Sequence, residues 1–357
     1  MPTGADLRWR LLRALLRLTV RRQLARASDP AAARAQFLRS VRLFVPDPPG
    51  AVFLPDRPGD VASLWAWLAA QDDPGHAPRA EEPAQVASPP GVLLYLHGGA
   101  FVLGSPRTHR ALAARLAGAA GLRALLPHYR RAPEHPFPAA LTDAMAVYEA
   151  LLGRGYPAGR IALAGDSAGG GLALSLAAEI GRRGLPAPGA LVAFSPVVDL
   201  TFSGASWREN HDRDPMLPAE RGPDMAAMWL QGADPRDPRA SPLFAEWVTP
   251  PPAALLFAAE TELLRDDATR MAARLRAAGG QAEARIAGDL PHVWPFLCPW
   301  VREGCETIAE AGAFLAAAVQ GSRQEPCARP FEGNCPPPGP GRRAAQPRSA
   351  SGAPTSR

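Results

Sequence analysis

The sequence predicts an α/β protein in which a mainly parallel sheet is covered on both faces by helices. Two observations predict this class. Strand-like apolar segments alternate with helix-like segments through most of the 357 residues, and such alternation is typical of parallel sheets. The chain is also 47% hydrophobic, which is enough to bury one large core. Because ligands of such sheets bind beyond the carboxyl ends of the strands, we expect the chemistry there.

The individual elements are predicted from local apolar patterns and from the Gly- and Pro-rich breaks between them. Eight strands are predicted, at residues 51–54, 61–68, 92–96, 123–127, 160–164, 191–195, 254–259 and 282–287. Helices are predicted at residues 7–27, 30–43, 109–119, 139–152, 168–183, 266–278 and 302–319. The stretch that ends at Pro90 has the composition of a surface insertion, and residues 201–232 read as irregular and partly helical.

The two ends of the chain differ from its middle in charge and composition. Every basic residue is an arginine, and the net charge of +5 arises from the first 45 residues and from the tail. Few aromatic residues are interleaved with this charge, so no nucleic-acid partner is expected. Residues 320–357 are rich in Pro, Gly, Ser and Arg without apolar periodicity, and we predict a disordered tail.

The first predicted helix is amphipathic and rich in arginine. Arg10, Arg13, Arg17 and Arg21 share one face, and leucines occupy the other. Two interpretations stay open. The helix makes weak contact with a membrane surface, or its leucine face packs on the protein as part of a lid.

The cysteines and the N-terminus bear on the compartment. Four cysteines, at 298, 305, 327 and 335, show neither metal-ligand nor disulfide-framework spacing, so a reducing compartment is expected. No run of eighteen apolar residues and no signal-peptide pattern is found. The sequence therefore predicts a cytoplasmic protein, and a homodimer is a further possibility.

The strongest motif is Gly165-Asp166-Ser167-Ala168-Gly169, which matches G-x-S-x-G between a predicted strand and a predicted helix. This is the context in which a nucleophilic serine sits on a sharp turn above the sheet. Glycines let the backbone fold tightly there, and the helix N-terminus favours developing negative charge. The motif predicts the α/β-hydrolase fold with Ser167 as nucleophile.

The base must follow the nucleophile in a chain of this fold. Of the seven histidines only His211 and His292 lie after Ser167. His211 falls in the irregular 201–232 segment, whereas His292 follows the last predicted strand. The sequence therefore predicts His292 as the base.

A carboxylate beyond the penultimate strand must hold the imidazole in the correct tautomer. Glu260, Glu262, Asp266 and Asp267 all lie there. Asp266 and Asp267 fall in the following helix, where we expect them to cap it against its dipole. Spacing alone leaves Glu260 and Glu262 unresolved.

A glycine-rich strand exit, His97-Gly98-Gly99-Ala100-Phe101, is the third element. Acyl transfer needs fixed N–H donors aimed at the oxyanion, and Gly99 and Ala100 are predicted to supply two of them. Ala168 is predicted to supply a third. We expect His97 to position this loop through backbone hydrogen bonds.

Taken together these residues resemble the bacterial esterases related to mammalian hormone-sensitive lipase. The resemblance covers roughly residues 90–318. It rests on four stretches: His97-Gly98-Gly99-Ala100-Phe101, Tyr129-Arg130-Arg131-Ala132-Pro133-Glu134-His135-Pro136-Phe137-Pro138-Ala139, Gly165-Asp166-Ser167-Ala168-Gly169-Gly170, and Glu262-Leu263-Leu264-Arg265-Asp266-Asp267 followed by His292. It implies a helical cap made of residues 1–45 and 201–232 on a catalytic domain at 46–319. It also implies that Glu262 is the acid.

Two residues depart from the family pattern. Glu262 stands where most members carry aspartate in an Asp-Pro-Leu-Arg-Asp motif, which adds one methylene of reach. Ala100 replaces the third glycine of the oxyanion motif, and its methyl group narrows the space beside the acyl carbon. Bulky tertiary-alcohol esters are therefore expected to fit less well.

The predicted activity is hydrolysis of short- to medium-chain carboxylic esters without metal or organic cofactor, since no metal-binding motif is present. A lactonase, amidase or peptidase would use the same residues. A non-catalytic small-molecule receptor is the alternative from another class, and the presence of His292 argues against it. Six residues either line an acyl pocket or form plain cap core: Trp207, Met216, Leu217, Met225, Met228 and Trp229.

Overall fold

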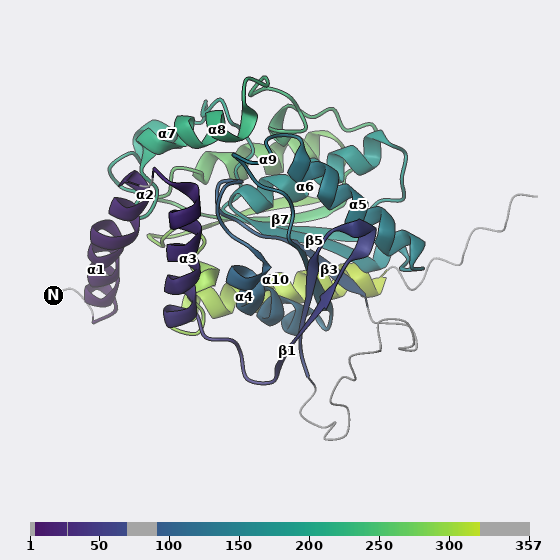
Figure 1. The fold of residues 1–357 in the computed structure, drawn as a ribbon, viewed down its shortest axis with the longest axis horizontal. Coiled ribbons are helices and arrows are strands. Elements are labelled where there is room, and N and C mark those ends of the chain that lie inside the picture. Colours follow the sequence, from purple (N-terminus) through teal and green to yellow (C-terminus); the bar gives the residue numbers. More distant parts are fainter. Residues whose placement is uncertain (1–3, 27, 70–90, 322–357) are drawn as a thin grey trace, which may run out of the picture. The chain divides into compact units, whose positions relative to one another are not determined.

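The computed structural model describes residues 4–26, 28–69 and 91–321 (Figure 1). Its centre is a sheet of eight strands in the order β1-β2-β4-β3-β5-β6-β7-β8. The pairs β1/β2 and β2/β4 are antiparallel, and all other neighbours are parallel. The strands are β1 (Ala51–Asp56), β2 (Ser63–Leu68), β3 (Val92–Leu96), β4 (Arg123–Pro127), β5 (Ile161–Asp166), β6 (Ala190–Phe194), β7 (Ala253–Ala259) and β8 (Ala282–Ala287). The predicted mainly parallel sheet is confirmed.

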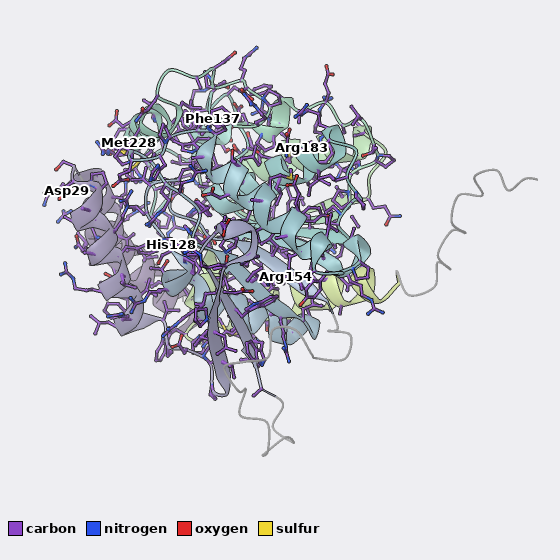
Figure 2. All side chains as sticks on the ribbon, turned by 45° about the vertical axis from the view of Figure 1, so that its right-hand side comes forward. Asp29, His128, Phe137, Arg154, Arg183 and Met228 are labelled. Atoms are coloured by element: carbon purple, nitrogen blue, oxygen red, sulfur yellow. A yellow bond between two sulfur atoms is a disulfide. The ribbon has the colours of Figure 1, made fainter. Side chains whose placement is uncertain are left out.

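Helices cover both faces of the sheet. The elements α4 (Pro106–Ala120) and α10 (Arg302–Gly321) pack on one face, and α5 (Ala139–Gly153), α6 (Ala168–Arg182) and α9 (Arg265–Ala277) pack on the other (Figure 1). Strand residues alternate between the two cores: Leu94 and Leu96 face α5 and α6, whereas Leu93 and Tyr95 face α4 and α10. This alternation explains why these strands read as continuously apolar. Figure 2 shows the described side chains on the same ribbon, turned by 45°.

The N-terminal helices precede the sheet. A helical stretch runs through α1 (Gly4–Leu16), a π-helical turn (Arg17–Arg21) and α2 (Arg22–Arg26), and α3 (Pro30–Phe44) follows. Asp29 caps α3, because its carboxylate accepts the N–H of Ala31 at 2.9 Å. In the 201–232 region, two short helices form, α7 (Ser206–Glu209) and α8 (Gly222–Leu230). Both predicted N-terminal helices are present, and the 201–232 segment is partly helical as expected.

The cysteine prediction needs a correction. Cys298 and Cys305 form a disulfide, with Cα atoms 5.2 Å apart. The physical reason is local. The chain turns through Trp294–Leu297 and then starts α10, so two cysteines seven positions apart meet across this turn. Cys327 and Cys335 lie outside the described residues.

Two further predictions fall on parts of the chain that the structure does not describe. The predicted insertion before Pro90 corresponds to residues 70–90, and the predicted tail corresponds to 322–357. Residues 320 and 321 belong to α10. In the described residues, no helix is both long and apolar enough to cross a bilayer.

Candidate active site

Ser167 lies on the turn between β5 and α6, as the motif predicts. Its backbone has φ 53° and ψ −124°, a conformation that side-chain-bearing residues rarely adopt and that surrounding contacts must hold. One such contact is the Ser167 N–H, which donates to the carbonyl of Phe194 at 2.8 Å. Another is the close approach of Gly169 to β3, where a side chain would clash with the carbonyl of Leu96. The turn therefore holds the Ser167 side chain at the carboxyl end of the sheet.

His292 and Glu262 meet beside this turn. The Nδ1 of His292 lies 2.9 Å from Oε2 of Glu262, and both side chains are buried. The other carboxylate oxygen of Glu262 accepts the N–H of Ala259 at 2.8 Å. A proton on Nδ1 makes the first contact a hydrogen bond, and it leaves the Nε2 lone pair of a neutral ring available. His292 and Ser167 line the same cavity.

Opposing effects act on the pKa of His292. Burial lowers it, but the hydrogen bond and the negative charge of Glu262 raise it, and the charges of Asp214 and Asp166 add to that effect. The balance leaves the pKa of His292 above its usual value of 6.5.

The structure separates the four carboxylates that the sequence left as candidates. Glu260 points to solvent, with 59% of its side chain exposed, and its nearest cation is Arg213 at 3.9 Å. Asp266 and Asp267 occupy the first turn of α9, at the positive end of its dipole as expected, and their carboxylates accept hydrogen bonds from backbone N–H groups of residues outside α9. Asp266 accepts the N–H of Ser206 at 2.9 Å, and Asp267 accepts the N–H groups of residues 198 and 199. Only Glu262 among the four reaches His292.

Three backbone N–H groups surround the Ser167 turn. Gly99 (φ 119°) and Ala100 (φ 53°) follow β3, and their N–H groups have no intramolecular acceptor within the described chain. Ala168 is the first residue of α6, so its N–H has no acceptor inside the helix. All three residues line the cavity that contains Ser167. The predicted donors therefore share one site.

Asp166, the residue before Ser167, holds the glycine-rich loop in place. Its Oδ1 accepts the N–H of Gly98 at 3.0 Å and the hydroxyl of Tyr95 at 2.8 Å. Its Oδ2 lies 3.3 Å from Nε2 of His109. Burial raises the pKa of Asp166, but the charge of His109 and these hydrogen bonds outweigh burial and bring the pKa below its ordinary value. Neither Asp166 nor His109 was assigned a role from the sequence.

His97 contacts backbone, in line with its expected positioning role. Its Nδ1 lies 3.0 Å from the carbonyl of Gly98, and its ring stacks on Tyr129 with centroids 4.1 Å apart. The hydroxyl of Tyr129 donates to the His97 carbonyl at 2.6 Å. The ring is fully buried, and His97 is not among the residues that line the cavity.

Two polar residues of the 201–232 segment clamp the loop that carries Glu262. The buried carboxylate of Asp214 accepts the N–H of Leu263 at 3.0 Å. The amide of Asn210 donates to the carbonyls of Glu260 and Glu262, at 2.9 and 2.8 Å. These contacts join positions about fifty residues apart, and no local pattern could have indicated them.

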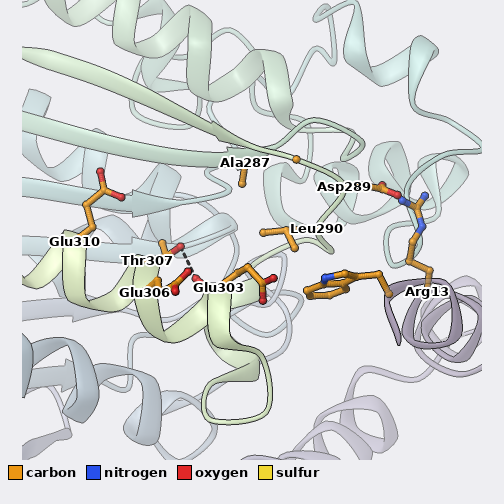
Figure 3. A pocket seen from close by; sticks show the side chains of 10 residues that line it. Arg13, Ala287, Asp289, Leu290, Glu303, Glu306, Thr307 and Glu310 are labelled. Atoms are coloured by element: carbon orange, nitrogen blue, oxygen red, sulfur yellow. Dashed lines mark hydrogen bonds and ion pairs between the residues drawn. The ribbon is translucent and has the colours of Figure 1, made fainter. Parts of the chain in front are cut away.

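The arginine face of the first helix docks on the same 201–232 segment. Arg13, Arg17 and Arg21 donate to the carbonyls of Arg213, Asp212 and Asp214, at 2.9, 2.7 and 2.6 Å. Arg13 also pairs with Asp289, three residues before His292 (Figure 3). The predicted arginine face is confirmed for these three residues, whereas the Arg10 side chain lies outside the described part.

The cavity above Ser167 has a volume of about 1310 Å³ and an apolar lining. Four of the six residues predicted as acyl pocket or cap core line it: Trp207, Met216, Leu217 and Met225. The other two do not. Trp229 is buried and stacks on Phe101 with centroids 3.6 Å apart, and Met228 packs against the core. The six residues therefore divide between the cavity lining and the core.

A second pocket, of about 730 Å³, lies between α1, residues 287–290 and α10 (Figure 3). Its lining contains none of the predicted site residues. Across the described ranges, no group of three or more His, Cys, Asp or Glu side chains is arranged to hold a metal ion.

Comparisons with known proteins bear on the fold and the family of this chain. Residues 93–296 match a family model described as an α/β-hydrolase fold. An acetyl-hydrolase of Streptomyces hygroscopicus is 43% identical over 64% of this chain and 76% of its own length. An ethyl acetate hydrolase of Pseudomonas putida is 32% identical over 82% of this chain and 89% of its own length.

A solved structure also matches the chain over most of its length. The crystal structure of an esterase from the bacterial hormone-sensitive lipase family is 34% identical, has a TM-score of 0.78, and covers 89% of this chain and 100% of that chain. The chain therefore belongs to the α/β-hydrolase-fold family, as an esterase of the bacterial hormone-sensitive lipase type.

Proposed function

We propose that this esterase hydrolyses short- to medium-chain carboxylic esters through an acyl-enzyme on Ser167. The observation that carries the proposal is the 2.9 Å contact between buried Glu262 and His292, because His292 lines the same cavity as Ser167. The names of the relatives, an acetyl-hydrolase and an ethyl acetate hydrolase, support short acyl groups. The cap is proposed to consist of residues 1–45 and 201–232, on a catalytic domain at 46–319.

The mechanism follows from the positions of these groups. Ser167 attacks the ester carbonyl while Nε2 of His292 accepts its proton, and Glu262 stabilises the imidazolium. The N–H groups of Gly99, Ala100 and Ala168 hold the negatively charged oxygen of the tetrahedral intermediate. The imidazolium protonates the leaving alcohol, and water then repeats the cycle on the acyl-enzyme.

The first test is a substrate series. Nitrophenyl acetate, butyrate and octanoate are expected to be hydrolysed with higher kcat/KM than nitrophenyl palmitate. A matched nitroanilide and a lactone are expected to react more slowly than the butyrate. Best turnover on the palmitate would contradict the chain-length prediction. Best turnover on the anilide or the lactone would show that an amide or a lactone, and not an open-chain ester, is the preferred substrate class.

The pH profile tests the role of His292. Only the neutral imidazole accepts a proton, so kcat/KM is expected to fall as the pH drops through the pKa of His292. Because the charge of Glu262 helps to raise this pKa above 6.5, the acidic limb should lie above that value. In Glu262→Gln the negative charge is gone, so the acidic limb of the profile of kcat/KM against pH should move to lower pH. An unmoved limb would show that Glu262 does not act on the titrating group.

Asp214 is proposed as a positioning residue for Glu262. It accepts three backbone N–H groups, from Leu263, Met216 and Leu217. Asp214→Ala leaves these three N–H groups without their acceptor, which costs about 1–3 kcal/mol of folding free energy for each group. The loop that carries Glu262 is then held less firmly, so kcat should fall by roughly 10- to 100-fold. The acidic limb should also move down, since the charge of Asp214 raises the pKa of His292.

The matched control for this variant is Asp212→Ala, because the Asp212 side chain is 96% exposed. It should keep the wild-type kcat and pH profile. A lower melting temperature in Asp214→Ala with kcat and pH profile unchanged would reduce Asp214 to a purely structural role.

A cytoplasmic location and a homodimer stay predictions. The Cys298–Cys305 disulfide is the observation that weighs against a reducing compartment, where such bonds seldom persist.

A further inference from the structure

Large apolar side chains are concentrated around the opening of the active-site cavity. Leu15 and Leu18, at 57% exposure each, Phe44 at 68% and Trp300 at 60% all line this cavity and yet face solvent. Leu11 on α1 and Leu43 on α3 are exposed as well. We call these residues the apolar rim: Leu11, Leu15, Leu18, Leu43, Phe44 and Trp300. Among the described residues only Val248 and Ile286 are large exposed hydrophobics outside the rim. Exposed apolar side chains are therefore concentrated in one region of the described surface.

The rim is a fixed surface. Leu11, Leu15 and Leu18 follow one another at helical spacing, on the side of the helix opposite the docked arginines. Those arginines hold the polar face of the helix on the 201–232 segment, and the three leucines are left exposed, whereas Leu16 is buried. At the end of α3, the carbonyl of Phe44 accepts a hydrogen bond from Nε1 of Trp300 at 2.6 Å. The rim is therefore built by polar contacts that turn apolar side chains to solvent.

Positive charge flanks the rim. Arg22 and Arg26 line the same cavity, and Arg39 and Arg42 lie on α3, all four of them exposed. No ion pair joins these four to a carboxylate in the described part of the chain. The first 45 residues contain ten arginines and two aspartates. A surface that combines leucine and aromatic side chains with arginines is suited to the headgroup region of an anionic bilayer.

We propose that the apolar rim and its four flanking arginines dock on an anionic phospholipid surface, with the mouth of the active-site cavity facing the lipid. A second copy of the chain fits the surface less well, because it would bring the same arginines together. The use of the surface for delivering ester substrates rests on the proposed function, whereas the binding itself does not.

The test uses vesicle sedimentation with the full chain carrying Ser167→Ala, so that lipid hydrolysis cannot interfere. Vesicles of phosphatidylcholine with phosphatidylglycerol should bind the protein more tightly than phosphatidylcholine alone, and added salt should weaken that binding. Equal, negligible binding to both vesicles overturns the proposal. Because binding is measured without catalysis, its failure leaves the esterase proposal standing.

Two variants test which residues bind. The double variant Leu11→Ser/Leu43→Ser changes two rim residues that do not line the cavity. It should weaken vesicle binding by at least about tenfold. Arg39→Gln with Arg42→Gln should reduce the preference for phosphatidylglycerol. The control, Val248→Ser with Ile286→Ser, removes the exposed hydrophobics outside the rim and should bind like the parent. All three should hydrolyse soluble nitrophenyl butyrate at the rate of the wild type when Ser167 is present.

Two results would contradict the docking surface. Binding of the Leu11/Leu43 variant equal to that of the parent would exclude the rim as the contact. A concentration-dependent dimer in light scattering that this variant abolishes, together with no vesicle binding, would show that the rim joins two copies of the chain.

Discussion

Ser167→Ala is expected to lower kcat for nitrophenyl acetate by at least about 10⁴-fold, because it removes the oxygen atom proposed to form the acyl-enzyme. The remaining rate would come from the oxyanion donors and substrate binding alone. His292→Ala should cause a loss of similar size, since the serine hydroxyl is a weak nucleophile without a base. The two losses should not add in the double variant, because the residues act as a unit.

Matched controls separate this effect from misfolding. Ser175→Ala changes a buried serine in the same helix, and His211→Ala changes the other histidine that follows Ser167. Both should retain most of the wild-type kcat. Near-full activity in Ser167→Ala would remove the proposed nucleophile, whereas an inactive but folded wild type would move the receptor hypothesis to the front.

Glu262→Gln is expected to lower kcat by roughly 10³-fold. An amide no longer stabilises the imidazolium, and its NH₂ group can favour the wrong tautomer of His292. The buried Glu262 side chain also accepts the N–H of Ala259, so glutamine keeps the shape of the site while it removes the charge.

Glu260→Gln is the matched comparison, at a glutamate two positions away whose side chain is exposed. It should keep kcat within about twofold of the wild type, as is usual for surface substitutions. Measurement of kcat for both variants on one ester decides whether Glu262 or Glu260 acts as the acid. An equal loss in both, or a larger loss in Glu260→Gln, would contradict the assignment of Glu262.

Much of the fold was predictable because the strands are buried on both faces. Their apolar runs, such as Val92–Leu96, and the glycine-rich breaks between them have a local signature. The nucleophile turn was predictable for a related reason: the sharp bend from β5 into α6 needs small residues on both sides of Ser167. Element ends shifted by a few residues, as for β2, which begins at Ser63 after a short helical turn at Pro58–Asp60.

The residues that hold the site together were not predictable. Asp214 and Asn210 contact the Glu262 loop across about fifty positions, and the buried hydroxyl of Ser195 accepts the N–H of Val293 beside His292 at 3.1 Å. Polar residues of these types are common on surfaces, so neither their type nor their spacing distinguishes a buried clamp. The disulfide was missed because the turn that joins its cysteines has no regular pattern.

By itself the sequence determined the fold class, the nucleophile turn, the glycine-rich donor loop and the histidine after the last strand, because each depends on short segments whose geometry their own residues dictate. Spacing alone left Glu260 and Glu262 open, and the family resemblance implied Glu262. The tertiary structure turns the Glu262 side chain toward His292 and the Glu260 side chain toward solvent. It also decided the orientation of the first helix. Both faces could have packed, and the carbonyls of residues 211–214 hold the arginines inward and leave Leu11, Leu15 and Leu18 in solvent.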